Sequence, residues 1–272
     1  MRADGDPVSA ETTLNPVYDD SRPGPSPPPR TVTVIVPCFN EEALVPALAR
    51  ACAHLARLLE GRYAVDFLFV DDGSTDATYD ELCRAVGGSP NWAIVRHERN
   101  RGIAAAIMTG IRHARSEIVC SIDADCTYDP AQLAAMIPLL ADGVDLVTAS
   151  PYHPLGRVRG VPWWRFGLSR TASRLYRLVL RQKLCTYTSC FRVYRRSAVV
   201  DLHLDHDDFI GIAELLWRLD SRGAGIVECP ALLETRTQSR SKMKLLKTMA
   251  GHARLLARAA WARIAGGGSA KQ

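Results

Sequence analysis

Four short apolar runs that alternate with helix-length segments restrict the fold of this chain more than any other feature. The runs cover residues 31–37, 65–70, 92–97 and 117–122. The first of them, TVTVIVP, is apolar at most positions, which is typical of a strand buried on both faces in a parallel sheet. Strands that alternate with helices at this spacing predict an α/β domain, with a Rossmann-like, mostly parallel central sheet flanked by helices.

Acidic residues gather just past the ends of these strands. Asp71 and Asp72 follow the second run, Asp123 and Asp125 follow the fourth, and Glu41 lies shortly after the first. Ligands of open α/β sheets bind outside the carboxyl ends of the strands, so we expect these side chains to share one ligand-binding edge. Aspartate is also common in turns, and this second interpretation stays open for Asp72 in particular.

The pair formed by Asp123 and Asp125 suits a hard divalent cation. Mg²⁺ and Mn²⁺ prefer oxygen ligands, and two carboxylates one residue apart can converge on one ion and a diphosphate. Another carboxylate at the same edge can accept hydrogen bonds from a nucleobase or a ribose. Neither GxxxxGK[ST] nor GxGxxG follows any of the strands, which argues against kinases and dehydrogenases.

Length and composition are those of a globular protein with a full core. The chain has 272 residues, of which 47% are hydrophobic, and its eight cysteines form no CxxC pair. Reduced thiols in a cytosolic protein are therefore expected, rather than disulfides or zinc ligands. No signal-peptide pattern opens the sequence, and no apolar run approaches the roughly 18 residues that span a bilayer. We expect a cytoplasmic protein without a transmembrane segment.

The sequence divides into an extension, a domain and a tail. Residues 1–30 are rich in Pro, Ser, Asp and Gly and predict a disordered extension. Residues 31–264 predict a single domain, with a nucleotide-sugar half at 31–130 and an acceptor half at 131–264. Residues 265–272 predict a flexible tail.

Charge is distributed unevenly between the two halves. Residues 1–150 hold 12 Lys and Arg against 21 Asp and Glu, whereas residues 151–272 hold 22 against 8. The basic half should face an anionic partner: a phosphorylated acceptor, a membrane surface or nucleic acid. Nucleic acid is the poorest of these, because the basic residues come without a recognisable recognition module.

Two segments in the basic half have the pattern of amphipathic helices. The first covers about 163–182, with an apolar stripe at Phe166, Leu168, Ala172, Leu175 and Val179 and arginines at 170, 174, 177 and 181. The second covers 242–264, with a stripe at Leu245, Met249, Ala253, Leu256, Ala260 and Ile264. Each stripe could pack onto the sheet, or the helices could lie peripherally on an anionic membrane.

Ordered motifs along the chain resemble those of family 2 glycosyltransferases with the GT-A fold. They are VIVPCFNEE, VDDGSTD, NRGIAAAIMTGIRHA, IDADCTYDP, TSCFRVYRR, FIGIAELLWRL and RTQSRSKMK, and together they cover most of residues 31–244. Within that family the order most resembles the dolichyl-phosphate mannose synthase and polyprenyl-phosphate glycosyltransferase group. The resemblance implies a metal-dependent, inverting transfer of a hexose from a GDP-mannose or UDP-glucose type of donor to a polyprenyl or dolichyl phosphate.

Roles for individual residues follow from the motifs and the resemblance together. The residues expected to bind the nucleotide sugar are Pro37, Asn40, Glu41, Asp72, Asp123, Arg236 and Lys242. Mg²⁺ or Mn²⁺ is expected on Asp123 and Asp125. The residues expected in catalysis are Asp125, Glu214 and Arg192, and those expected to bind the acceptor are Arg157, Arg192 and Arg195. The oligomeric state is not indicated by the sequence.

Three departures from the group's pattern fall in the acceptor half, at Pro151, Cys190 and Ser239, where Ser239 replaces a Gly, and a fourth lies beside the carboxylate pair. Thr127 replaces a Gln that usually serves as a further metal ligand, and Cys190 replaces a Gly. Pro151 replaces an Arg that the resemblance places on the acceptor phosphate. Two alternatives therefore stay open: an acceptor that is a hydroxyl on a glycan, peptide or metabolite, and an inactive homologue that binds nucleotide or membrane.

Overall fold

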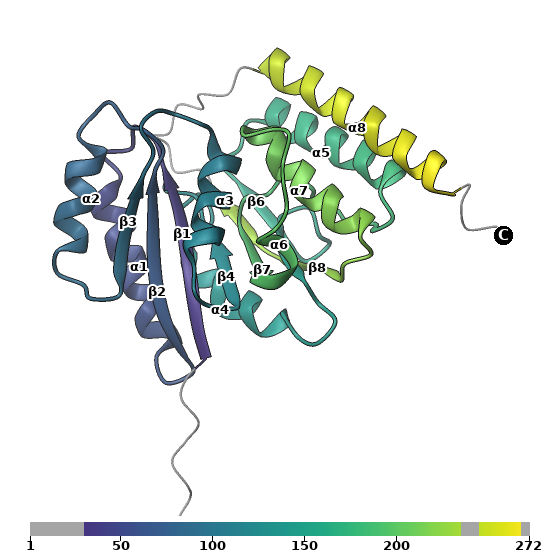
Figure 1. The fold of residues 1–272 in the computed structure, drawn as a ribbon. Helices are drawn as coiled ribbons and strands as arrows, with labels where there is room; N and C mark the ends of the chain where they lie inside the picture. The colour runs from purple at the N-terminus through teal and green to yellow at the C-terminus, as the bar shows by residue number, and fades with distance from the viewer. Residues whose placement is uncertain (1–29, 235–244, 268–272) are drawn as a thin grey trace, which may run out of the picture.

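The computed structural model describes residues 30–234 and 245–267. A seven-stranded sheet with the order β3-β2-β1-β4-β7-β5-β8 lies at the centre (Figure 1). It confirms the mostly parallel α/β sheet predicted from the sequence. Nearly all of the predicted extension lies outside the described residues, as do Arg236, Lys242 and residues 268–272. Residues 265–267, predicted as tail, instead continue the last helix.

The first half of the chain builds the parallel part of the sheet. Its strands are β1 (Arg30–Cys38), β2 (Tyr63–Asp71), β3 (Trp92–Arg96) and β4 (Ile118–Ser121). Its helices are α1 (Val45–Leu59), α2 (Thr78–Val86) and α3 (Ile103–His113). Because β1 pairs in parallel with both β2 and β4, the carboxyl ends of these three strands reach the same edge.

One strand of the second half of the chain runs antiparallel to its neighbours in the sheet. The strands of this half are β5 (Leu146–Ser150), β6 (Arg157–Arg159), β7 (Arg192–Arg195), β8 (Ile226–Pro230) and β9 (Leu232–Glu234). Strand β7 lies between β4 and β5 and is antiparallel to both, so β4 and β5 run in the same direction. The ends of β4 and β5 therefore lie at one edge, with the small β6-β9 sheet beyond them.

The helices of the second half are short except for three. The short ones are η1 (Pro130–Gln132), α4 (Leu133–Met136), η2 (Ile137–Leu139) and α6 (Arg196–Val199). The long ones are α5 (Trp163–Val179), α7 (Phe209–Ser221) and α8 (Leu245–Gly267). These three gather at one end of the molecule (Figure 1). No helix among the described residues combines the length and the hydropathy that crossing a membrane requires.

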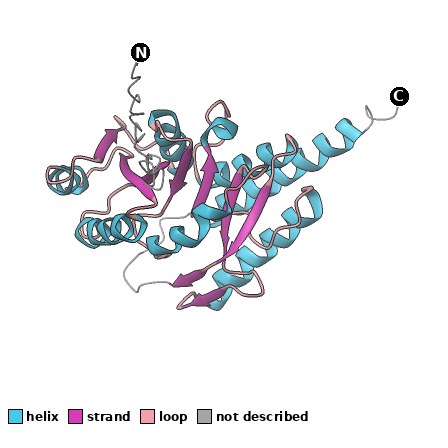
Figure 2. Cartoon of the chain, turned by 90° about the horizontal axis from the view of Figure 1, so that it is seen from below, coloured by secondary structure: helices cyan, strands magenta, loops and turns pink. Residues whose placement is uncertain are grey.

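Alternation along β1 supplies both faces of the core. Val32, Val34 and Val36 belong to one buried cluster, with residues of α1, α2 and α4, whereas Ile35 belongs to a second cluster, with residues of α3 and α7. Successive side chains of a strand point to opposite faces of the sheet, and helices lie on both sides of the strands (Figure 2). This two-sided burial explains why β1 lacks the polar alternation of a half-exposed strand.

Candidate active site

The predicted carboxylates lie along one edge of the sheet. Asp71 is the last residue of β2, and Asp123 and Asp125 follow directly after β4. Pro151 and Tyr152 follow β5 at the same edge, because β5 runs in the direction of β4. Topology therefore brings a part of the second half beside the acidic residues of the first.

Backbone contacts fix the turn that carries Asp123 and Asp125. The carbonyl of Asp123 accepts a hydrogen bond from the N–H of Cys126 at 3.1 Å. The carboxylate of Asp125 accepts one from the N–H of Thr127 at 2.9 Å. Cys126 adopts the left-handed conformation, with φ of 51°, which folds the chain back on itself. Both carboxylates thus occupy defined positions just past the strand.

The two carboxylates repel each other. Desolvation, followed by the negative charge of Asp125, raises the pKa of Asp123 to about 7, while a hydrogen bond with the thiol of Cys190 acts in the opposite direction. Like charges that share a site disfavour ionisation of both. A cation between the carboxylates would remove this repulsion.

The donor set fits a hard divalent metal ion. Both side chains offer carboxylate oxygens, and Mg²⁺ is commonly held by one or two carboxylates together with substrate phosphates and water. Among the described residues, no three His, Cys, Asp or Glu side chains are arranged to hold a metal by themselves. The fit thus rests on Asp123 and Asp125, the pair chosen from the sequence.

Asp72 organises the loop beside the site. One of its oxygens hydrogen-bonds to Nδ1 of His97 at 2.6 Å and to the N–H of Arg101 at 2.9 Å. The other accepts from Nδ2 of Asn100 at 3.0 Å and from the N–H of Gly102 at 2.8 Å. The structural interpretation that the sequence left open is therefore realised, and a contact between Asp72 and the nucleotide stays a prediction.

Gly73 allows this loop to approach the end of β2. Its φ is 69°, and a Cβ at this position would lie 2.3 Å from the carbonyl carbon of Arg99. Glycine is the residue that tolerates both the positive φ and the close backbone. The sequence DDG thus serves the packing of residues 97–102 against the sheet edge.

The end of β1 is tied to the segment before α2. The N–H of Asn40 donates to Oγ of Ser74 at 3.0 Å, and the N–H of Glu41 donates to Oγ1 of Thr78 at 2.7 Å. Oδ1 of Asn40 accepts from the N–H of Thr75 at 2.8 Å. Pro37 is half-buried near the end of the strand. The three residues expected on the nucleotide thus lie at the predicted edge, and their contacts with a nucleotide stay predictions.

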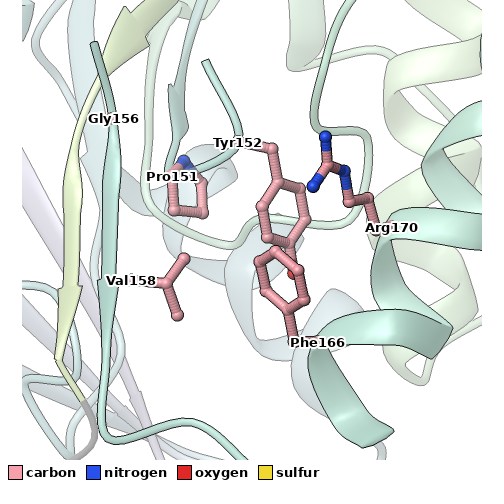
Figure 3. Close-up of a pocket in the computed structure, with 6 residues that line it drawn as sticks. All are labelled: Pro151, Tyr152, Gly156, Val158, Phe166 and Arg170. Carbon is pink, nitrogen blue, oxygen red and sulfur yellow. The ribbon is translucent and has the colours of Figure 1, made fainter. Parts of the chain in front are cut away.

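A pocket of about 300 Å³ opens beyond the end of β5 (Figure 3). It is lined by Pro151, Tyr152, Gly156, Val158, Phe166 and Arg170. The rings of Tyr152 and Phe166 meet edge to face, with their centroids 5.3 Å apart. The guanidinium carbon of Arg170 lies 5.6 Å from the centroid of the Phe166 ring. The pocket therefore combines an apolar and aromatic wall with one cation.

Tyr128 connects this pocket with the carboxylate pair. Burial raises the pKa of Tyr128 above its ordinary value, and the nearby Asp123 and Tyr152 both add to that rise. The ring of Tyr128 also packs against Phe191, with the centroids 5.2 Å apart. The pocket and the carboxylate pair thus lie at the same edge of the sheet, past the ends of β5 and β4.

Glu214 does not have the environment of a catalytic residue. Its side chain is fully buried in α7, and its oxygens accept from the N–H groups of Asp205 and His206 and from the side chains of His206 and Arg218. Burial alone would raise the pKa of Glu214, but these hydrogen bonds lower it below its ordinary value. The catalytic role predicted for Glu214 is corrected: the carboxylate holds the segment 205–206 against α7.

Arg192 is likewise used inside the protein. It is fully buried, and its guanidinium donates to the carbonyls of Ile212 and Tyr187, each at 2.9 Å. A phosphate could not reach a side chain enclosed in this way. The predicted catalytic and acceptor-binding roles of Arg192 are therefore corrected to a structural one, which joins β7 to α7.

Arg195 lies at the wrong edge of the sheet for its predicted role. Strand β7 is antiparallel to β4, so Arg192 pairs with Ser121 near the site, whereas Arg195 pairs with Ile118 at the far end. There Arg195 donates to the carbonyls of Ala141 and Val144. Its predicted contact with the acceptor is wrong because the strand direction was not known.

Arg157 stays a candidate, and two further cations lie outside the described residues. Arg157 is exposed on β6, next to Val158 of the pocket wall. Arg236 and Lys242 belong to the segment 235–244, for which no structural statement is made. The last described residue before that segment, Glu234, donates its N–H to the carbonyl of Thr127 at 2.9 Å, two residues beyond Asp125.

Comparison with known proteins agrees with this geometry. The model of the family described as "Glycosyl transferase family 2" matches residues 33–202. The chain belongs to glycosyl transferase family 2. The match covers both the carboxylate pair and the pocket. The sheet edge described above therefore lies within the part of the chain that the family shares.

Two relatives extend the family-2 match along the chain. Polyprenol monophosphomannose synthase from Mycolicibacterium smegmatis is 32% identical over 227 residues, which are 79% of this chain and 82% of that protein. Undecaprenyl-phosphate 4-deoxy-4-formamido-L-arabinose transferase from Klebsiella pneumoniae is 26% identical, over 81% of this chain and 65% of that protein. The resemblance to the polyprenyl-phosphate group predicted from the motifs is confirmed.

A solved structure shows the fold of this family-2 chain. Glucosyl-3-phosphoglycerate synthase from Mycobacterium tuberculosis, crystallised with Mn²⁺, UDP and glucosyl-3-phosphoglycerate, superposes with a TM-score of 0.62. The two chains are 20% identical, and the match covers 84% of this chain and 78% of that one. The GT-A fold predicted from the sequence is thereby confirmed.

Sequence reasoning missed the pocket residues. From the sequence, Phe166 and Arg170 are placed on different stripes of one helix, and no role is assigned to Tyr152. The available signal was an aromatic residue and an arginine four positions apart, which lie close together on a helix. Nothing in the sequence indicated that this helix begins beside the end of β5.

Proposed function

We propose that the protein is an inverting hexosyltransferase that moves a sugar from a nucleotide diphosphate donor to a polyprenyl phosphate. The observation that carries the proposal is the shared edge: a carboxylate pair after β4 adjoins an aromatic pocket with one arginine after β5. The 32% identity to a polyprenol monophosphomannose synthase supports this choice of acceptor class.

The donor side would bind the diphosphate through a metal ion. Asp123 and Asp125 are the residues that would hold Mg²⁺ or Mn²⁺, and the ion would supply positive charge to a leaving nucleoside diphosphate. The structural relative crystallised with Mn²⁺ and UDP supports a divalent ion in this fold. The turn contacts of Asp125 with Thr127 hold the carboxylate in place before any ligand arrives.

The acceptor side would use the pocket beyond β5. A guanidinium pairs strongly with phosphate, and Arg170 stands among apolar and aromatic side chains that suit the first units of a prenyl chain. A phosphate oxygen is already anionic at neutral pH and needs no general base, whereas a hydroxyl does. The enclosure of Glu214, the base candidate on the acceptor side, therefore favours the phosphate.

Direct displacement at the anomeric carbon would follow from this arrangement. The acceptor oxygen would approach from the pocket while the diphosphate leaves on the side of Asp123 and Asp125, so the anomeric configuration would invert. The residues of this chain position the two substrates and balance the charge of the leaving group.

A transfer assay tests the proposal. Purified protein is incubated with labelled GDP-mannose or UDP-glucose and Mn²⁺, with a short-chain polyprenyl phosphate or with soluble hydroxyl acceptors. Labelled prenyl phosphate sugar that disappears in Asp125→Asn is the expected result. If sugar is transferred only to hydroxyl acceptors, the proposed acceptor class is wrong. If no donor gives any transfer, the proposal that the protein is an enzyme is overturned.

A further inference from the structure

Cys190 stands opposite Asp123 in the fold. Strands β4 and β7 are neighbours in the sheet (Figure 1), and their antiparallel register pairs Ser121 with Arg192. Continued two residues further, the same register sets Asp123 opposite Cys190. Side chains of directly opposed residues lie on the same face of a sheet and close enough to interact. Strand pairing therefore brings Cys190 beside the first carboxylate of the pair.

The thiol of Cys190 makes use of this position. It forms a side-chain hydrogen bond with the carboxylate of Asp123. A thiol offers one weak donor, whereas an ionised carboxylate has about four acceptor sites on its two oxygens. One hydrogen bond from sulfur therefore orients the carboxylate and leaves most of its acceptor capacity for a cation.

Contacts on both sides of the carboxylate pair fix the segment that carries the thiol. The hydroxyl of Ser121, two residues before Asp123, donates to the carbonyl of Cys190. The next residue along the chain, Phe191, packs its ring against that of Tyr128, which follows the pair. Residues 190 and 191 are thus attached to the chain both before and after the metal-binding turn.

Burial strengthens the contact between the thiol and the carboxylate. Cys190 is only 3% exposed, and a hydrogen bond is electrostatically stronger in such a low-dielectric place than in water. Asp125 has a donor of its own, the N–H of Thr127. Each carboxylate of the pair therefore has a separate donor that orients it, a backbone N–H for Asp125 and a thiol for Asp123.

We propose that Cys190 is a positioning residue of the metal site and acts through Asp123. Its S–H holds the carboxylate of Asp123, so that the pair is arranged for Mg²⁺ or Mn²⁺ before the ion arrives. Groups that hydrogen-bond to metal ligands commonly determine how tightly the metal is bound. The inference rests on the proposed function, because the metal ion belongs to the donor side of that reaction.

Cys120 provides the matched comparison for a cysteine that only fills space in the core. It is fully buried on β4, and its side chain belongs to the cluster of Val34 and Ile122, on the other face of the sheet from the cluster of Cys190. Removal of either sulfur leaves a small cavity. Removal of the sulfur of Cys190 also takes a donor from Asp123. The variants Cys190→Ala and Cys120→Ala therefore separate positioning from packing.

Calorimetric titration of the full chain with Mn²⁺, in the presence of UDP and separately of GDP, tests the inference. In Cys190→Ala the Kd for Mn²⁺ should rise about tenfold, the lower end of the range for groups behind a metal ligand, because a thiol is a weak donor. In Cys190→Ser, whose hydroxyl can also donate, the Kd should stay within about threefold of the native value. Cys120→Ala should bind Mn²⁺ like the native protein, although its melting temperature should fall.

The Mn²⁺ dependence of the transfer rate gives a second readout. At Mn²⁺ concentrations below the native Kd, Cys190→Ala should transfer sugar about tenfold more slowly than the native protein, and this deficit should narrow as Mn²⁺ is raised. Cys120→Ala should follow the native curve. A deficit in Cys190→Ala that is the same at every Mn²⁺ concentration would contradict a role in metal binding.

The possible results separate this inference from the proposed function. If Cys190→Ala binds Mn²⁺ as tightly as the native protein, or if Cys120→Ala loses the same affinity, the inference is overturned while sugar transfer by the native protein still supports the function. Equal losses in Cys190→Ser and Cys190→Ala also overturn it, since the hydrogen bond would not be the cause. A selective loss of Mn²⁺ affinity in Cys190→Ala, without sugar transfer by the native protein, would leave the positioning role intact and remove the function. Native protein that binds no Mn²⁺ with either nucleotide would overturn the inference, and the transfer assay would then decide the function separately.

Discussion

The donor edge and the acceptor half use their charged residues in opposite ways. At the donor edge, Asp123 and Asp125 follow a strand directly, and the turn holds them where a ligand can reach them. In the acceptor half, Glu214 and Arg192 are fully buried and hydrogen-bonded to groups within the protein. Asp123 and Asp125 are thus placed where they could bind a ligand, whereas Glu214 and Arg192 are internal supports, as Asp72 is beyond the end of β2.

Among the substitutions that test this comparison, replacement of Asp125 should have the largest effect on activity. Asp125→Asn removes a negative charge from the expected metal site, and kcat should fall about 10³-fold while the melting temperature changes little. Steady-state transfer rates and thermal unfolding measure the two quantities. Asp142→Asn, on an exposed turn, is the control and should retain native kcat. Equal activities of native protein and Asp125→Asn would show that Asp125 is not part of a donor site.

Glu214→Ala should affect stability rather than chemistry. The change leaves the side chains of His206 and Arg218 and the partly buried N–H groups of residues 205 and 206 without their acceptor, so the free energy of unfolding should fall by about 3 kcal/mol. Urea unfolding measures this loss, and Glu60→Ala, at an exposed position, is the control. A stable Glu214→Ala protein with a kcat reduced by about 10² or more would restore the catalytic role.

The pH dependence of stability gives an independent check on Glu214. Its pKa is lowered in the folded state, so the carboxylate stabilises the fold above the pKa of the unfolded chain, and this contribution is lost as the pH falls through the folded value. The difference in unfolding free energy between native protein and Glu214→Gln should therefore shrink as the pH drops below the ordinary value of 4.5. A difference that stays constant down through that range would contradict the assignment.

Arg170→Met should weaken acceptor binding moderately. Loss of one charge-assisted contact raises KM for a short-chain prenyl phosphate about tenfold, with kcat nearly unchanged. Arg174→Met, one turn further along α5, is the matched control, because Arg174 does not line the pocket. Parallel changes in the KM of both variants would indicate a general charge effect instead of a specific contact.

Arg195→Met should have the smallest effect on catalysis. Because Arg195 lies at the far edge of the sheet, KM for the acceptor should stay within about twofold of the native value. Loss of its hydrogen bonds to Ala141 and Val144 should lower the free energy of unfolding by about 1 kcal/mol. A large rise in KM would show that the register of β7 does not describe the active enzyme.

The sequence predicted the donor edge better than the acceptor half for a physical reason. The strands β1, β2 and β4 are buried on both faces, so their apolar runs are easy to recognise, and parallel pairing fixes where they end. The reversal at β7 leaves no comparable signal, because RVYR is compatible with either direction. Arg195 was therefore placed at the wrong edge.

Glu214 and Arg192 show a second limit of sequence reasoning. A buried ionised group must find partners, but those partners can be a ligand or the protein's own backbone. The segments that satisfy Glu214 lie before α7 and on α7 itself, at Asp205, His206 and Arg218. The spacing of these residues in the chain did not reveal that they would converge on the carboxylate.

The sequence by itself determined the α/β sheet, the family motifs and the carboxylate pair after β4, because these depend on periodicity and on residues close together in the chain. Tertiary structure alone decided which charges are enclosed, which edge Arg195 occupies, and that α5 begins beside the end of β5. It also left part of the apolar stripes of α5 and α8 exposed, at Leu175, Met249 and Ile264. Such outcomes depend on which distant surfaces bury each other, and an apolar stripe looks the same in sequence whether its partner is the core or something outside the chain.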